Sequence, residues 1–328
     1  MRRLDRIEKE VGYCEVKLEK ERRLRCQKLY LQAEVEALDE VLGSYAPAAV
    51  ESQLKYNRLA GVAMSEVPRI LRQGTKEERQ AVRRDFLSLA TYVALREERE
   101  VLGNELEALV QRLAAYEGFA TRRSRLLEQR RQTLEGLGIR EGDGGSSLLE
   151  EFQKTEARWN ALSEDCANLE EAGSHVERNL DYLRSARNFL LAARATFDID
   201  EWRRSGCFSD LFKHSAVGRA FEMVQGADLN AKLAEKELLC LQARKFQHTS
   251  IERVLVPFMQ ALFEDLFVLS SFQNTKAVLE EAEKANRRHY EELVAFQKKV
   301  EEERDQLEAE REQKFAEMGE EVKRIAYQ

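Results

Sequence analysis

Asp210 and His214 form the one pair of side chains whose types and spacing suggest catalysis. Residues four apart share one face of a helix, so the carboxylate could orient the imidazole as a general base. The surrounding sequence carries no nucleophile signature and no phosphate-binding glycine loop. We therefore expect His214 to stabilise a turn, and we predict no catalytic residue and no enzyme activity.

Metal ligands are the next chemistry to consider. Helical di-metal sites use Glu-x-x-His pairs, and this motif does not occur in the sequence. Glu264 and Asp265 are adjacent, point about 100° apart on a helix and are expected to face solvent or arginines of a neighbouring helix. The histidines are far apart and form no H-x-x-x-H pair: His175, His214, His248 and His289. We predict neither a metal nor a cofactor.

The cysteines occur singly, without a C-x-x-C pair: Cys14, Cys26, Cys166, Cys207 and Cys240. This pattern predicts free thiols in a reducing cytoplasm. No apolar segment follows Met1, so no secretory signal is expected. The most apolar run, Val254 to Phe272, contains acidic residues that are costly in hydrocarbon, and it is expected to be a core helix.

Residues 198–216 differ from the rest of the chain because the helical pattern breaks and aromatic residues gather there. Glycine permits a positive φ, the aromatic side chains offer apolar area, and a serine can cap the next helix. We predict a compact aromatic turn built from Trp202, Gly206, Phe208, Asp210, Phe212, Lys213, His214 and Ser215.

The composition of the chain indicates that long helices lie on either side of such a turn. Of 328 residues, 34% are charged, 3 are proline and 16 are glycine, which is typical of long helices. The net charge of −7 argues against a nucleic-acid partner that depends on bulk positive charge. The sequence predicts an elongated all-α protein of helical hairpins and coiled coil.

The expected organisation has five parts. They are N-terminal helices with a coiled-coil seam (1–74), a long arm ending in a Gly-rich linker (75–147), a second arm (148–197), the aromatic turn (198–216) and a C-terminal arm with a charged coiled-coil end (217–328). The linker from Gly136 to Ser147 holds five glycines and is expected to be the tip or hinge between two arms.

Apolar residues at 3-4 spacing define two seams. The N-terminal seam is Leu4, Ile7, Val11, Cys14, Leu18, Leu24, Leu31, Val35, Leu38 and Leu42, and the C-terminal seam is Leu279, Ala282, Leu293, Phe296, Val300 and Leu307.

Breaking residues set the expected helix ends. The first helix should end at Gly43–Pro47, and a second should run from Pro47 to about Pro68. Further helices are expected over Lys76–Leu134, Ser147–Ala195, Ala216–Val256 and Pro257–Ala326.

A basic group lies close to the linker: Arg122, Arg123, Arg125, Arg130 and Arg131. Such a group can contact anionic lipid or an acidic partner. We favour another interpretation, in which the group is a solvated face or forms ion pairs between arms.

In shape and composition over the whole chain, the sequence resembles phage-shock-protein A and ESCRT-III type membrane-remodelling proteins, which are acidic and built on helical hairpins. The resemblance includes no motif, so no residue role is transferred from it. It implies a peripheral protein that contacts an anionic membrane.

The sequence favours a cytoplasmic structural or scaffolding protein that self-associates through exposed seams and charged edges. Two alternatives stay open. One is a peripheral membrane-remodelling protein, and the other is a regulatory adaptor that binds a protein partner in a motor or secretion machine.

Overall fold

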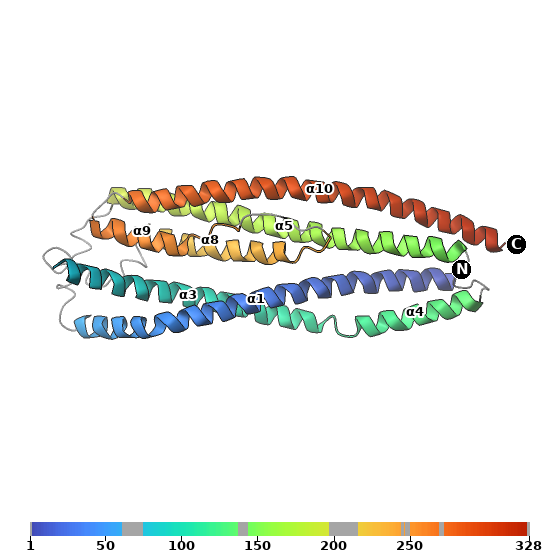
Figure 1. Ribbon diagram of the computed structural model, residues 1–328, viewed down its shortest axis with the longest axis horizontal. Coiled ribbons are helices and arrows are strands. Elements are labelled where there is room, and N and C mark those ends of the chain that lie inside the picture. The colour runs from blue at the N-terminus through green and yellow to red at the C-terminus, as the bar shows by residue number, and fades with distance from the viewer. Residues whose placement is uncertain are drawn as a thin grey trace.

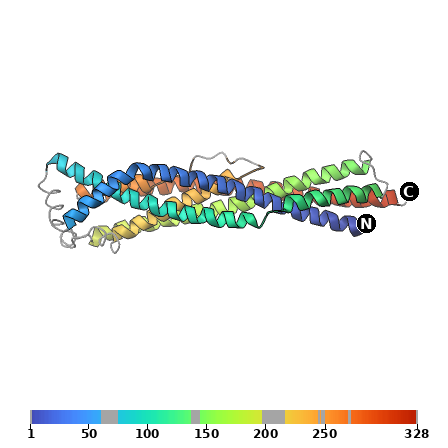
Figure 2. The same ribbon diagram turned by 90° about the horizontal axis from the view of Figure 1, so that it is seen from below.

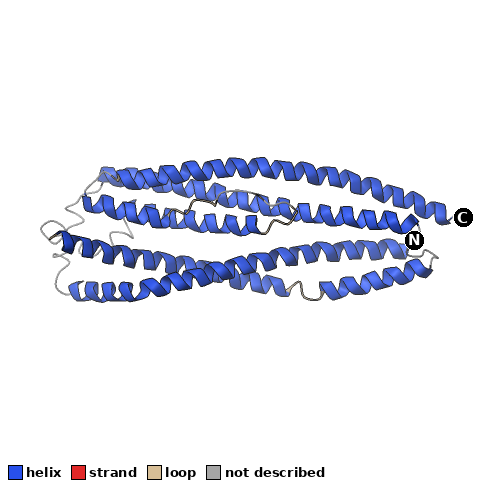
Figure 3. Ribbon diagram, viewed as in Figure 1, coloured by secondary structure: helices blue, strands red, loops and turns tan. Residues whose placement is uncertain are grey.

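The computed structural model describes residues 2–60, 75–136, 144–196, 216–243, 246, 250–268 and 272–326. Within these ranges the chain is helical apart from short connections, and there is no strand (Figure 3). The predicted all-α class is confirmed. The proposed aromatic turn, from Trp202 to Ser215, lies outside the described residues, as do Pro68 and the linker positions 137–143.

The helices form an elongated bundle of two layers, with both chain termini at the same end (Figures 1 and 2). In the first layer α1 (Arg2–Ala60) packs against α3 (Lys76–Ala114) and α4 (Phe119–Gly136). In the second layer α5 (Gly144–Thr196) packs against α10 (Gln273–Ala326). Two shorter helices, α8 (Ala216–Leu239) and α9 (Leu255–Val268), complete the second layer and contact the first.

Most described residues of the two predicted seams are buried by contacts within the chain. Leu24, Leu31 and Leu38 of α1 join a core with α3 and with the half of the bundle that contains α8 and α9. On α10, Leu293 and Val300 are fully buried in a second core shared with α5. Both seams are therefore occupied by contacts within the chain.

The expected end of the first helix at Gly43–Pro47 is wrong, because α1 continues to Ala60. Proline removes one helical hydrogen bond, but its ring fixes φ near the helical value. A Cβ added at Gly43 would meet nothing within 4 Å, so this turn is open to solvent. An exposed turn can lose one bond without ending the helix.

The expected single helix over Lys76–Leu134 is also wrong, because the chain turns between α3 and α4. Gly118 has a φ of 92°, a left-handed value that glycine adopts without a steric penalty. The preceding amides bond three residues back, as from Tyr116 N to Leu113 O at 3.0 Å. Gly103, by contrast, stays within α3. The start of α3 at Lys76 agrees with the expected start of this helix.

The expected helix over Ala216–Val256 ends early, at Leu239. Residues 240–243 and 250–254 are not helical, and side chains of α5 and α8 accept hydrogen bonds from some of the amides there. Asp165 of α5 accepts hydrogen bonds from the amides of Gln242 and Ala243, both at 2.8 Å. The Asp228 carboxylate on α8 accepts from Val254 N at 2.5 Å and from the next amide. These acceptors replace the carbonyls that a continued helix would supply.

The expected helix over Pro257–Ala326 is divided into α9 and α10. Phe272 has a φ of 54°, and Asp265 accepts hydrogen bonds from the amide and the hydroxyl of Thr275 at 2.8 and 2.7 Å. Asp265 is 1% exposed and caps α10, so its expected position facing solvent is wrong. Glu264 is exposed.

The start of α5 at Gly144, rather than at Ser147, places part of the predicted linker inside a helix. In the described part of the chain, every helix is too short or too polar to cross a membrane.

Candidate functional site

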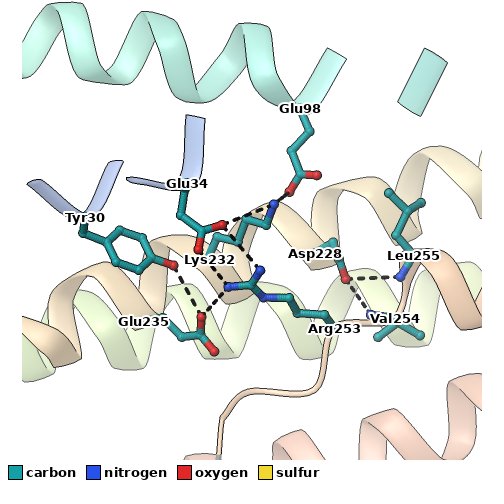
Figure 4. A network of polar contacts seen from close by, with 9 residues as sticks. All are labelled: Tyr30, Glu34, Glu98, Asp228, Lys232, Glu235, Arg253, Val254 and Leu255. Atoms are coloured by element: carbon teal, nitrogen blue, oxygen red, sulfur yellow. Dashed lines mark hydrogen bonds and ion pairs between the residues drawn. The ribbon is translucent and has the colours of Figure 1, made fainter. Parts of the chain in front are cut away.

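A network of polar contacts lies where α1 and α3 meet α8 (Figure 4). It joins the two layers, and we call it the inter-layer cluster. Its members are Tyr30 and Glu34 of α1, Glu98 of α3, Asp228, Lys232 and Glu235 of α8, and Arg253 of the segment before α9.

Lys232 is the central cation of the inter-layer cluster. Its Nζ lies 2.8 Å from Glu98 Oε1 and 3.5 Å from Glu34 Oε2. Only 5% of the lysine side chain and 7% of the Glu98 side chain is exposed. One ammonium of the second layer therefore bridges carboxylates from two helices of the first, α1 and α3.

Arg253 is the second cation. Its Nη2 lies 2.7 Å from Glu235 Oε2 and 3.3 Å from Glu34 Oε1. Tyr30 donates its hydroxyl to Glu235 at 3.4 Å. Arg253 thus fixes the irregular segment before α9 against α1 and α8 together.

Burial shifts the pKa values of two carboxyls in this cluster upward. Desolvation raises the pKa of Glu98 above its ordinary value of 4.5, against the charge of Lys232, which lowers it. Desolvation also raises the pKa of Asp228, although two backbone amides and the nearby cations favour its charged form. The cluster holds four acidic side chains and two cations, so its positive charges are too few to neutralise all of its carboxylates.

A neighbouring ionic group surrounds Arg23 of α1. The guanidinium Nη2 lies 2.7 Å from Glu171 of α5 and 3.1 Å from Glu237 of α8. Gln27 also donates to Glu237, at 2.6 Å. This group fixes α1 to both α5 and α8 beside the inter-layer cluster.

A third set of contacts is uncharged and lies within the second layer. Asn286 of α10 donates to Asn179 Oδ1 of α5 at 2.9 Å and accepts from Glu252 N at 2.8 Å. Asn179 in turn donates to the carbonyl of Ala227 at 2.7 Å. Buried amides thereby join α5, α8, α10 and the segment before α9.

The polar contacts of these three groups hold helices together in fixed positions. Among the described residues, no group of three or more His, Cys, Asp or Glu side chains is arranged to hold a metal ion. His175 bonds Asn230 at 3.0 Å, and desolvation lowers its pKa below 6.5. His289 is buried with its ring edge against Phe246.

Several residues of the predicted basic patch take part in ion pairs. Arg122 Nη2 lies 3.1 Å from Glu10, and Arg123 Nη2 lies 2.8 Å from Glu15, so both contact α1. Arg131 pairs with Glu128 on its own helix at 2.9 Å. The hydrogen bond from Arg122 lowers the pKa of Glu10. Carboxylates of the same chain therefore neutralise much of the positive charge that this patch would need to bind an anionic membrane.

The two remaining arginines of that patch differ from each other. Arg130 is buried, and its guanidinium faces the amide of Gln153 on α5. Arg125 is exposed. The predicted residues of the aromatic turn, from Trp202 to Ser215, lie outside the described ranges.

Sequence reasoning missed the inter-layer cluster completely. Lys232 and Glu235 lie in a charged stretch of α8 that is indistinguishable by composition from a solvated surface. One signal was present, because Ala227, Ala231 and Ala234 recur at helical spacing and form a buried small-residue face of α8. Charged residues interleaved with such a face can lie at a packed helix crossing.

Comparisons of the chain with models of protein families, with curated proteins and with solved structures found no match.

Proposed function

We propose that the chain is a non-catalytic structural rod that serves as a scaffold and associates with further copies of itself. The observation that carries the proposal is the inter-layer cluster, in which Lys232 of the second layer pairs with Glu34 and Glu98 of the first.

Buried ion pairs of this kind contribute specificity of position. A displacement of one layer along the other would leave Lys232 or Glu98 buried without its partner, which is strongly unfavourable. Apolar seams alone tolerate small sliding displacements better, because hydrophobic burial is not directional. The cluster therefore supports a rod whose two layers keep one register, as a scaffold requires.

The length of the helices supports the same proposal. The 59 residues of α1 span about 90 Å at 1.5 Å per residue. A rod of this length holds binding partners at its two ends far apart while its middle stays fixed by the ionic contacts.

Self-association is the second part of the proposal. The predicted seams are used within the chain, so contacts between copies would use other faces. Several large apolar side chains are more than half exposed: Tyr13 (51%), Leu29 (68%), Leu239 (61%) and Phe315 (60%). Burying such side chains between copies is favourable, at about 25 cal/mol per Å² of apolar surface.

The cytoplasm is the compartment that we propose. The cysteines of the described chain, Cys14, Cys26, Cys166 and Cys240, are free thiols. Free thiols are typical of a reducing compartment.

Sedimentation velocity over a concentration series tests the proposal. We expect an elongated particle whose weight-average mass rises with concentration. The double variant Leu29→Glu/Leu239→Glu should shift association to higher concentration, and Gln111→Glu, an exposed change on α3 that adds one negative charge, should not. A particle that stays monomeric at every concentration would contradict self-association, and a compact particle would contradict the rod.

A further inference from the structure

Two cysteines far apart in the sequence meet at the junction of α1 and α8. The Cys26 thiol of α1 lies 3.7 Å from the carbonyl oxygen of Leu239, the last residue of α8. Cys240 follows Leu239 directly in the chain, and the two thiols interact closely enough that each shifts the pKa of the other. Cys26 is partly exposed, whereas Cys240 is 3% exposed.

A buried polar frame holds the two thiols in this position. Gln27 and Arg23, on either side of Cys26 in α1, both contact Glu237 Oε2, at 2.6 and 3.1 Å. Glu237 is 0% exposed, and its carbonyl accepts the amide of Cys240 at 3.2 Å. The residues close to both cysteines are therefore tied to one glutamate, so the thiol contact belongs to the packed structure.

The two thiols have different acidities. A hydrogen bond from Cys240 lowers the pKa of Cys26 from 9.0 to about 7, burial and the charge of Glu237 oppose this shift, and the charge of Arg22 supports it. The pKa of Cys240 is raised, first by the same hydrogen bond and then by burial. Burial raises the pKa values of Cys14 and Cys166. Among the described cysteines, Cys26 thus has the most thiolate character near neutral pH, and the thiolate is the nucleophile.

We infer that Cys26 and Cys240 form a redox-active dithiol pair that hydrogen peroxide converts into a disulfide between α1 and the end of α8. The Cys26 thiolate attacks one peroxide oxygen, the O–O bond breaks, and Cys26 becomes a sulfenic acid as hydroxide leaves. The sulfur of Cys240 then attacks the sulfur of Cys26. The S–S bond forms, the S–O bond breaks, and the released hydroxyl leaves with the proton of Cys240 as water.

The net reaction converts two thiols and one peroxide into one disulfide and two waters. The bond joins the first layer covalently to the second beside the inter-layer cluster. A thiol reductant reverses the reaction through a mixed disulfide. This inference goes beyond the proposed scaffold function and does not depend on it.

The test is peptide mapping of the reduced full-length chain after treatment with hydrogen peroxide. Remaining thiols are alkylated, and the chain is digested without reductant. We expect a linked peptide that contains Cys26 and Cys240 as the main product, with Cys14 and Cys166 alkylated. The rate should rise about tenfold between pH 6 and pH 8 and then level off, as the thiolate fraction of a thiol with a pKa near 7 does.

Variants identify the order of the two steps. Cys240→Ser should form no disulfide and should leave a sulfenic acid at Cys26 that a dimedone probe traps. Cys26→Ser should give neither product, and Cys14→Ser should behave as the wild type. Circular dichroism checks that each variant folds.

The wild-type map is decisive even where a variant does not fold. A main product that links Cys26 to Cys207, or that links two copies of the chain, would overturn the inference. So would a map in which Cys26 and Cys240 both remain alkylated while other thiols are oxidised.

Discussion

The ammonium nitrogen of Lys232 lies 2.8 Å from Glu98 Oε1, and only 5% and 7% of these two side chains is exposed. The lysine belongs to α8 and the glutamate to α3, so their ion pair joins the two layers. Removal of one member of a buried pair leaves a charge without compensation, which costs more than the pair itself contributes. This asymmetry makes the pair a sensitive position for mutation.

Lys232→Met should lower the free energy of unfolding by about 3 to 5 kcal/mol, since it leaves Glu98 and Glu34 without their shared cation. Urea denaturation measures the change. The matched control is Lys276→Met, which removes an exposed pair with Glu280 at 3.5 Å and should cost about 0 to 1 kcal/mol. Equal effects of the two substitutions would show that Lys232 is not buried as described.

Glu98→Gln should change how stability depends on pH. Burial raises the folded-state pKa of Glu98 above 4.5, so the folded state binds the proton more tightly than the unfolded state. The stability that this tighter proton binding contributes is therefore fully present below the unfolded pKa of Glu98, and it is lost as the pH rises through the folded pKa. Glutamine resembles the protonated acid and does not titrate.

The melting temperature of Glu98→Gln minus that of the wild type should consequently be higher at pH 8 than at pH 4.5. The groups facing Glu98, which are Lys232, Asp228 and Arg253, are the same in both proteins. Thermal melts of the two proteins across this range test the expectation. A difference that is constant with pH, or that has the opposite sign, would contradict a raised pKa for Glu98.

Gly118→Ala should destabilise the chain by about 1 to 2 kcal/mol, because an L-residue is strained at a φ of 92°. Gly43→Ala is the matched control. It lies in a helix with open space around its Cβ position and should stabilise the chain by about 0.5 to 1 kcal/mol. Chemical denaturation of both variants gives the comparison. Stabilisation by Gly118→Ala would mean that α3 and α4 form one continuous helix.

The sequence was sufficient to predict the helices and their buried faces, because these depend on local periodicity. The spacing of Leu293 and Val300 places both on one face of a helix and predicts that this face is buried. Both side chains are buried in the structure. The breaks were harder to predict. A glycine marks the turn at Gly118, but the end of α8 at Leu239 has neither glycine nor proline, and its backbone depends on Asp165, more than seventy residues earlier.

The same limit explains why the candidate sites were missed. Periodicity tells which face of α8 is buried but not which helix covers it. The contact of Lys232 with Glu98, and that of Cys26 with Cys240, exist only because α1 and α3 lie across α8 in the folded bundle. Pairings between such distant segments carry no local sequence signal.

The central claim is that the two layers lie side by side in a closed rod. Small-angle X-ray scattering coupled to size-exclusion chromatography measures this most directly, on the monomer fraction. A closed rod as long as α1 should give a maximum dimension of roughly 90 to 120 Å. Layers separated about the α4–α5 connection would give about 180 Å, and a compact globule of this length would measure about 50 Å. Either of the last two values would contradict the closed two-layer rod.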